Sequence, residues 1–287
     1  MLPADTRVTE IALTVADLAG QVRFYTRVLG LDVVDEPPGS VWLGAGDHAF
    51  LRLDERRGAA PAPGATGLFH FAILYPTRRD LASVADRLVG LGHPLQGAAD
   101  HLVSEAVYLV DPEGNGIEVY RDRPREAWPV ANGMIEMATD PLDLRGLLAE
   151  AARPEVWTIP SATRLGHVHL RVADIPAAER FYIETLGFDL TARYGRQASF
   201  FSAGGYHHHV AVNTWQTRGA PPPPEGALGL KWFRIEVPSA EALAAARAAL
   251  EAEGVEAGHG NGALWVTDPA GNEMVISAQG RKPKAEV

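Results

Sequence analysis

The sequence predicts an α+β protein built from four βαβββ units, and three observations predict this class. The first is internal repetition, because the stretch from Glu10 and the stretch from His167 align without a gap. The second is the alternation of strand-like runs with amphipathic runs of Ala, Leu and Val. The third is a pair of similar strand–turn–strand endings, VYLVDPEGNGIEVY and LWVTDPAGNEMVIS.

The two aligned copies share one local plan. EIALTVADLAGQVRFYTRVLGLDV and HVHLRVADIPAAERFYIETLGFDL each begin as an alternating strand and continue as a helix with Phe-Tyr on its buried face. Asp17 and Asp174 fit the helix N-cap or first turn, where short acidic side chains are preferred. Gly30 and Gly187 fit the position just after the helix, which favours glycine.

Two further units have different helices, and the four units together account for most of the chain. We predict modules at residues 7–54, 67–121, 164–216 and 229–279. The linkers GAAPAPGATG and GAPPPPEGALG separate the first module from the second and the third from the fourth. Residues 122–163 form a longer central linker, for which we predict one helix at 142–152.

Composition limits the classes of function. The 287 residues are enough for two domains with substantial cores, and the chain has no cysteine, which excludes disulfides and thiolate metal ligands. The net charge of −10 argues against a nucleic-acid partner. No apolar run is long enough to cross a membrane, and the N-terminus does not resemble a signal peptide, so we expect a cytoplasmic protein.

One carboxylate in the second module needs an explanation. The turn DPEGNG is followed by the strand-like run Ile117-Glu118-Val119-Tyr120, in which alternation places Glu118 and Tyr120 on one face. Either Glu118 faces water or it points inward and needs a cation. The carboxylate alone does not decide between these interpretations.

The module pattern resembles the vicinal oxygen chelate superfamily, whose members pair two βαβββ units into a cupped sheet that holds one metal. Across nearly the whole chain the sequence further resembles extradiol ring-cleaving dioxygenases of the catechol 2,3-dioxygenase kind. The family signature is matched by a short set of residues, with Ala99 where glycine is commoner: His101, Val107-Tyr108, Asp111-Pro112, Gly114 and Glu118. The implied fold is two cupped mixed β-sheet domains with helices outside, the glyoxalase/bleomycin-resistance/extradiol dioxygenase fold.

The resemblance implies a metal centre. Glu118 would be one ligand, and His70 and His167, on the opening strands of the second and third modules, would be the other two. Such a facial triad suits Fe(II), because it leaves adjacent positions for both oxygens of a catechol and for O2, and Mn(II) would fit the same ligands. A lone histidine on an apolar strand is more often a core or surface residue, but two at matching positions with Glu118 favour ligation.

The same comparison predicts how the modules pair. The first module has Glu10 where the third has His167, and the fourth has Val275 where the second has Glu118. We align Arg234 of the fourth module with His70. Modules two and three would therefore form the catalytic cup, and modules one and four a structural cup in which Glu10 and Arg234 form a salt bridge.

Three residues match catalytic positions of the extradiol family. His208, in the run His207–His209, matches the histidine that transfers the substrate proton, and an ordinary imidazole pKa suits that role. We expect this run on a strand, with His208 facing opposite to its two neighbours. Tyr108 matches the tyrosine that binds the catecholate oxygen, and His101 the histidine beside it. Tyr108 could instead be a core aromatic, and the histidine run could be an exposed cluster.

The resemblance also implies the partners, which are a small aromatic diol and O2, and a homo-oligomer. Candidate substrate-binding residues are His169, Tyr206, His209 and Trp215. Two alternatives remain open within the superfamily. One is a metal-dependent glyoxalase or isomerase, and the other is a metal-free protein that binds small molecules. The sequence does not tell which ring substituents are accepted.

Overall fold

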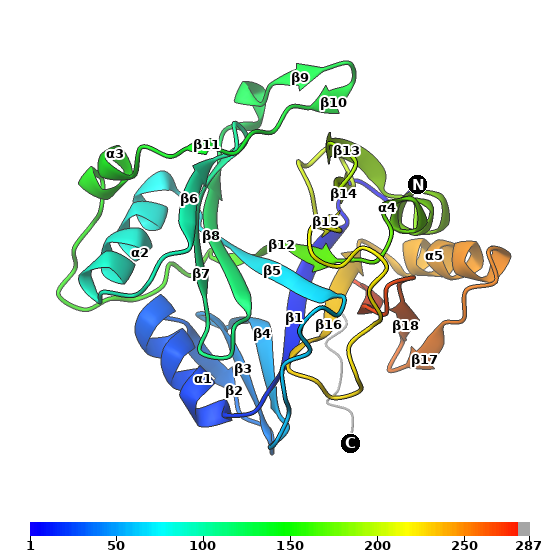
Figure 1. Cartoon of the computed structure of the whole chain (residues 1–287), viewed down its shortest axis with the longest axis horizontal. Helices are drawn as coiled ribbons and strands as arrows, with labels where there is room; N and C mark the ends of the chain where they lie inside the picture. The colour runs from blue at the N-terminus through cyan, green and yellow to red at the C-terminus, as the bar shows by residue number, and fades with distance from the viewer. Residues whose placement is uncertain (281–287) are drawn as a thin grey trace.

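Four βαβββ modules follow one another in the computed structural model, which describes residues 1–280 (Figure 1). The helices are α1 (Leu18–Phe24), α2 (Arg78–Gly90), α3 (Leu144–Ala149), α4 (Ile175–Glu179) and α5 (Ala240–Ala252), with π-helical turns at Tyr25–Leu29 and Arg180–Thr185 and a 3₁₀ turn at Arg125–Ala127. Within residues 1–280, no helix combines the length and the apolar character needed to cross a membrane. The α+β class is confirmed.

The modules pair in nested order. Strands of modules one and four form an eight-stranded sheet, here the 1/4 sheet: β17 (Gly258–Gly260), β18 (Ala263–Thr267), β19 (Glu273–Ala278), β16 (Gly229–Val237), β1 (Arg7–Val15), β4 (His48–Glu55), β3 (Ser40–Ala45) and β2 (Asp32–Asp35). Strands of modules two and three form a nine-stranded sheet, here the 2/3 sheet: β11 (Asp140–Pro141), β6 (Gly97–Asp100), β7 (Ser104–Val110), β8 (Gly116–Asp122), β5 (Gly67–Leu74), β12 (Arg164–Arg171), β15 (Val210–Asn213), β14 (Ala198–Ser202) and β13 (Asp189–Tyr194).

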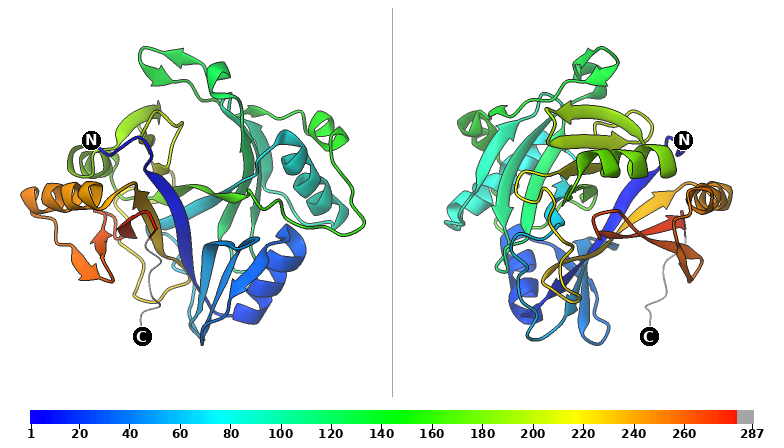
Figure 2. Two further views of the ribbon diagram at one scale, coloured as in Figure 1. Left: turned by 180° about the vertical axis from the view of Figure 1, so that it is seen from behind. Right: turned by 45° about the vertical axis from the view of Figure 1, so that its right-hand side comes forward.

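Both sheets are strongly curved, and each joins its two modules through one antiparallel strand pair, β1 with β16 and β5 with β12 (Figure 2). The central linker adds β11 to the 2/3 sheet and forms a separate hairpin of β9 (Val130–Ala131) and β10 (Met134–Ile135). This hairpin projects at the top of Figure 1, and β10 packs against β13. The linker therefore spans from one end of the 2/3 sheet to the other.

The repeated helix starts form as the sequence predicts. The Asp17 side chain accepts a hydrogen bond from the Gly20 backbone, and Asp174 accepts one from Ala177. Gly30 has a φ of 78°, the left-handed conformation that ends the π-helical turn after α1. Both predicted N-caps are thus confirmed.

Alternation along the central strands separates an apolar face from a polar face. Val168 and Leu170 of β12 belong to the large apolar core that both sheets share. His167 and His169 alternate with them and therefore lie on the concave face of the 2/3 sheet. The concave face is where the unusual polar residues collect.

Two repeat-related hydrogen bonds join the sheets. Tyr25, which follows α1, donates to Asp111 over 2.9 Å, and Tyr182 donates to Asp268 over 3.1 Å. Each tyrosine belongs to one sheet's module and each aspartate to the turn that precedes the last strand of the other sheet's module. Asp111, a residue of the family signature, therefore lies at the contact between the sheets.

The register of the 1/4 sheet corrects one sequence alignment. The predicted ion pair is present, with Arg234 Nε 2.9 Å from Glu10 Oε2. However, β1 pairs Ala12 with Trp232, as β12 pairs His169 with His70, so the residue equivalent to His70 is Trp232 and not Arg234. The alignment was wrong by two residues, a shift that leaves every side chain on the same face of a strand.

Candidate metal centre

Three buried side chains converge on the concave face of the 2/3 sheet. His70 Nε2 lies 3.0 Å from Glu118 Oε2, and His167 Nε2 lies 3.3 Å from the same oxygen. One ligand atom from each of the three residues lies within 4.8 Å of the others. Their exposed fractions are only 7% for His70, 3% for Glu118 and 1% for His167.

Three neighbouring strands supply these residues. β8 runs parallel to β5, and β5 runs antiparallel to β12, so Glu118, His70 and His167 come from both modules. Two bulges interrupt the β5–β12 pair, with Phe69 and Gly166 as the extra residues. Bulges of this kind redirect side chains next to functional sites.

Glycine at position 166 is a steric requirement. A Cβ atom there would lie 1.8 Å from the Tyr120 hydroxyl oxygen, which is far inside van der Waals contact. Tyr120 is fully buried, and its ring lies 4.9 Å from the His167 ring, centroid to centroid. The bulge and the tyrosine ring together fix where His167 lies.

The protonation states suit metal ligation. Burial raises the pKa of Glu118, but His167 and His70 outweigh burial, and the pKa lies well below its ordinary value. Burial lowers the pKa of His167 to about 4 despite the attraction of Glu118. His70 Nε2 is buried and lies 3.0 Å from Glu118 Oε2, but without the alignment of a hydrogen bond. A carboxylate, a neutral imidazole and an unused ring nitrogen are what a divalent transition metal requires, so the donor set fits such an ion.

A cavity of about 850 Å³, within the usual range for a small-molecule site, lies over His70 and Glu118, next to His167. One wall is residues 134–139 of the central linker. His70 and Glu118 contribute to the floor, and Trp215, 41% exposed, lies at the rim. The cavity is also lined by Phe69, His101, Tyr108, Glu136, His169, Arg171, Arg193, Phe200 and His208.

Tyr108 and His101 form a hydrogen-bonded pair in this cavity. His101 Nδ1 lies 2.6 Å from the Ala138 carbonyl oxygen, which can only accept, so this nitrogen carries the proton. His101 Nε2 then accepts from the Tyr108 hydroxyl over 2.5 Å. Burial, followed by the charge of Glu118, raises the pKa of Tyr108 well above its ordinary value. The phenol is therefore neutral, and its oxygen remains able to accept a further hydrogen bond.

A buried chain of side chains sets the tautomer of His208. Asp122 accepts from His207 Nε2 over 2.9 Å, and His207 Nδ1 lies 2.8 Å from His208 Nδ1. When His207 is neutral and donates to Asp122, it accepts at Nδ1, and His208 then carries its proton on Nδ1 and has a free lone pair on Nε2. Burial, then the nearby imidazoles, keeps the pKa of His208 well below its ordinary value. The ring lies 4.0 Å from that of His167, centroid to centroid.

The expected strand at the histidine run is wrong. Residues 207–209 form a bend before β15, which begins at Val210. His207 is fully buried and does not face solvent. The run follows the glycine turn Gly204–Gly205, where both φ values are positive, and the chain bends there instead of extending.

The four candidate substrate-binding residues divide into two pairs. His169 and Trp215 line the cavity, and His169 Nε2 accepts from the Asn213 side chain over 3.0 Å. Tyr206 and His209 do not line it, contrary to expectation. Tyr206 instead donates to Asp122 over 2.9 Å, behind the His207 ring. Sequence reasoning missed Phe69, Arg171 and residues 135–139 of the wall; alternation from His167 could have indicated Arg171.

The equivalent place in the 1/4 sheet is filled by apolar side chains. Trp232 stands at the His70 position and Val275 at the Glu118 position, with Trp42 and Trp265 packed beside them. Arg234 is buried and pairs with Glu10. Among the residues described, only His70, Glu118 and His167 form a cluster of three potential ligands.

The chain is similar to known proteins over most of its length. The model of the Glyoxalase/Bleomycin resistance protein/Dioxygenase superfamily matches residues 7–119 and 164–276. The catechol-2,3-dioxygenase of Bacillus subtilis (strain 168) is 42% identical over 244 residues, 83% of this chain and 85% of that protein. The biphenyl-2,3-diol 1,2-dioxygenase 3 of Rhodococcus globerulus is 29% identical over 141 residues, 47% of this chain and 74% of the relative.

A solved structure shows the same fold at lower identity. Glyoxalase I from Zea mays has a TM-score of 0.58 and 17% identity, with 95% of this chain and 92% of that chain covered. The matched residues of the family model take in all four modules. The chain therefore belongs to the glyoxalase/bleomycin resistance protein/dioxygenase superfamily.

Proposed function

We propose that the protein is an extradiol dioxygenase that cleaves a catechol-type aromatic diol with O2. Its metal, Fe(II), would be held by His70, His167 and Glu118. The observation that carries the proposal is the convergence of these three buried side chains under a cavity of about 850 Å³. The similarity to the catechol-2,3-dioxygenase of Bacillus subtilis supports it.

Fe(II) on these ligands would supply adjacent positions for the two diol oxygens and O2, and would allow electron transfer between them; Mn(II) fits the same donors. The remaining contributions come from the protein. The cavity walls exclude water and hold the aromatic ring, with Phe200 and Trp215 as apolar surfaces. Positioning of this kind is a large part of catalysis with a bound cofactor.

We assign Tyr108 and His101 to substrate orientation. The Tyr108 hydroxyl gives its hydrogen to His101, so its oxygen can accept one from a hydroxyl group of the diol. His101 is fixed in turn by the Ala138 carbonyl of the central linker. The pair thus links the position of the substrate to that of the cavity wall.

We assign proton transfer to His208. Its Nε2 lone pair is available, because Nδ1 is engaged by His207, which is itself held by Asp122. An imidazole in this tautomer can take a proton from the substrate at Nε2 and return it later. His207 and Asp122 would act as positioning residues. The 1/4 sheet, with its tryptophans and ion pair, would have a structural role.

The experiment is anaerobic purification, metal analysis, and then addition of catechol with air. We expect one Fe or Mn ion per chain and a yellow ring-opened product. E118Q removes one anionic ligand and should lose most of the metal. As a control, E10Q removes a carboxylate at the repeat-related position of His167 in the 1/4 sheet and should keep it.

Two results would contradict the proposal. One is full metal content in E118Q, which would mean that the ion binds elsewhere. The other is a metal-loaded protein that leaves catechol colourless, which would favour an isomerase or a binding protein of the same superfamily.

A further inference from the structure

Arg171 is an unusual residue of the catalytic cavity. It is the last residue of β12 and shares the concave face with His167 and His169 by strand alternation. It lies four positions after His167, which is about 13 Å along a strand. That distance leaves space between the metal centre and Arg171 for one aromatic ring and a short substituent.

The guanidinium of Arg171 has no hydrogen-bond or ion-pair partner among residues 1–280. Its Nε is buried without a hydrogen bond, and no carboxylate forms an ion pair with it. Burial alone lowers the pKa of Arg171, with no acidic group opposing that effect. By contrast, Arg193, which lines the same cavity, is held by Glu179 through two bonds of 2.7 and 2.9 Å.

An unpaired, partly buried cation is costly, so its surroundings are informative. The guanidinium lies over the Phe69 ring, 5.6 Å from the centroid. Phe69 is the extra residue of the β5 bulge, and its ring contacts Trp215 at 5.2 Å. The bulge thus supplies an aromatic floor that positions Arg171 but does not neutralise it.

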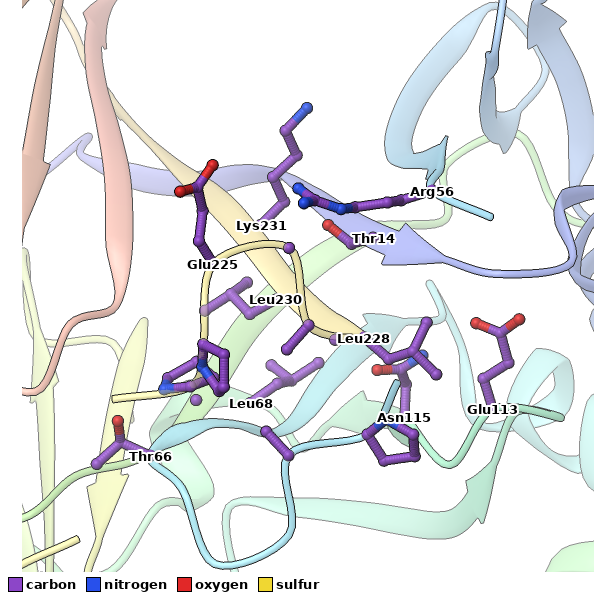
Figure 3. Close-up of a pocket in the computed structure, with 18 of the residues that line it drawn as sticks. Thr14, Arg56, Thr66, Leu68, Glu113, Asn115, Glu225, Leu228, Leu230 and Lys231 are labelled. Carbon is purple, nitrogen blue, oxygen red and sulfur yellow. The ribbon is translucent and has the colours of Figure 1, made fainter. Parts of the chain in front are cut away.

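A second cavity, of about 810 Å³, lies between the two sheets (Figure 3). Arg171 and Gly114 line both cavities. Among the acids that line the second cavity, both oxygens of Glu113 accept from the backbone of Ala16 and Asp17, and Asp54 pairs with Lys231. Figure 3 also shows Arg56 beside this second cavity. Among the described residues, no acid that lines either cavity forms an ion pair with Arg171.

The catalytic cavity also contains the acidic residue Glu136. Glu136, on the wall formed by the central linker, has no ion-pair partner among the described residues. It lies on the segment that also holds His101, whereas Arg171 lies at the end of β12. The cavity therefore has a negative group on the linker wall and a positive group at the Arg171 end.

We propose that Arg171 binds an anionic substituent, of the carboxylate class, on the ring of the diol substrate. This inference rests on the proposed dioxygenase function and names the class of its substrate. A planar guanidinium matches a carboxylate with two parallel hydrogen bonds, and a partly buried site strengthens them. Glu136 would disfavour the reversed orientation, with the carboxylate toward the linker.

The internal repeat supplies the test variant. Thr14 stands in β1 where Arg171 stands in β12, since Thr14 pairs with Gly229 as Arg171 pairs with Gly67. R171T therefore introduces a residue that this strand position already accommodates, and R171M keeps the length of the side chain without its charge. R171K retains a positive charge as the conservative variant.

The experiment compares 3,4-dihydroxyphenyl carboxylates with zero, one or two methylenes before the carboxylate, each against its neutral primary amide. Cleavage is measured as kcat/KM, and binding to the Fe(II)-loaded protein is measured by anaerobic calorimetry. For at least one chain length, we expect the wild type to prefer the carboxylate by about ten- to hundredfold in both measurements. R171T and R171M should abolish that preference, and R171K should keep part of it.

R56Q is the matched control, because it removes an exposed arginine of the second cavity and should leave the preference unchanged. Equal kcat/KM for carboxylates and amides in the wild type, with both cleaved, overturns the Arg171 inference and leaves the proposed function intact. A preference that survives R171T and R171M, or that R56Q abolishes, overturns it too. If no diol is either bound or cleaved, the proposed function fails and this inference fails with it.

Discussion

At the scale of single residues, the candidate site depends on hydrogen bonds that decide which atom of each side chain is free. The Ala138 carbonyl accepts from His101 Nδ1, and Asp122 holds His207, whose Nδ1 lies against Nδ1 of His208. His169 Nε2 accepts a hydrogen bond from the Asn213 side chain, so His169 is less suited to proton transfer. The roles therefore follow from the partners of each imidazole, because the sequence alone cannot distinguish one histidine from another.

We predict that H208A and H208N keep metal content near that of the wild type and lower turnover by about 10²-fold or more, the usual scale for loss of a general acid or base. Metal analysis and kcat with catechol measure the two effects. H207A should lower turnover less, since it removes only the group that orients His208. Wild-type turnover in both H208 variants would show that this histidine moves no proton.

At the scale of elements, the central strands explain what the sequence could and could not predict. Repetition and alternation were enough to predict the N-caps and the buried face of the helix at Phe24 and Tyr25, because these depend on local chemistry. The bulges at Phe69 and Gly166 depend on pairing with a strand that is distant in sequence, so they cannot be predicted from the local sequence pattern. The same reason explains the misplaced equivalence between His70 and Arg234.

The wrong predictions for the histidine run, the central linker and Tyr206 also have a physical cause. The histidine run has the alternation of a strand, but the two glycines before it turn the chain, and its rings are then held by tertiary partners such as Asp122. The central linker has no copy elsewhere in the chain, so repetition could not show that residues 134–139 cover the cavity. Tyr206 was consequently expected in the cavity and is found behind it.

We predict that G166A destabilises the fold by about 1–3 kcal/mol, the usual cost of overpacking, because its Cβ would collide with the Tyr120 hydroxyl. It should also weaken metal binding, since Tyr120 contacts His167. Urea unfolding and metal titration measure these effects. G97A, in β6 of the same sheet, has open space at its Cβ and should change neither quantity. Unchanged metal affinity in a folded G166A would contradict the role of the bulge.

Glu105 on β7 should make stability depend on pH. Burial opposes its ionisation, but hydrogen bonds from Arg78 and Arg121 outweigh burial and hold its pKa below the ordinary value of 4.5. The ion pairs therefore stabilise the folded state above about pH 4.5, and this contribution disappears as the pH falls through the lower folded-state pKa. E105Q should be less stable than the wild type at pH 7, and the difference should shrink below pH 4.5.

Thermal unfolding from pH 3 to 7 measures that difference. E150Q is the control, because Glu150 also pairs with Arg78 but its side chain is 49% exposed. We expect little effect of E150Q at any pH. A constant gap between E105Q and the wild type across the whole range would mean that the ionisation of Glu105 does not contribute.

At the scale of the whole molecule, the two sheets are joined by copies of one contact. Tyr25 with Asp111 and Tyr182 with Asp268 are related by the internal repeat, and all four residues are buried. In each pair the tyrosine follows the first helix of an odd-numbered module, and the aspartate lies in the turn of the next module. The contacts thus connect modules that belong to different sheets.

We predict that Y25F and Y182F each destabilise the protein by about 1 kcal/mol, the net value of one hydrogen bond. For a chain of this size the melting temperature should fall by roughly 2 °C for each variant. The double variant should show the sum if the two contacts are independent. Y194F, at an exposed tyrosine, is the control. A double variant as stable as the wild type would mean that these two hydrogen bonds do not stabilise the contact between the sheets.

The nested pairing of the modules determines the order in which a growing chain can complete its sheets. The 2/3 sheet, with all three candidate ligands, can be complete once module three has left the ribosome. β1 must wait for β16, about 200 residues later, or roughly 10–40 s at common rates of synthesis. During that time one edge of β1 lacks its partner, and such an edge can pair with other chains. The first module made is therefore the last to be protected, and aggregation during synthesis should begin there.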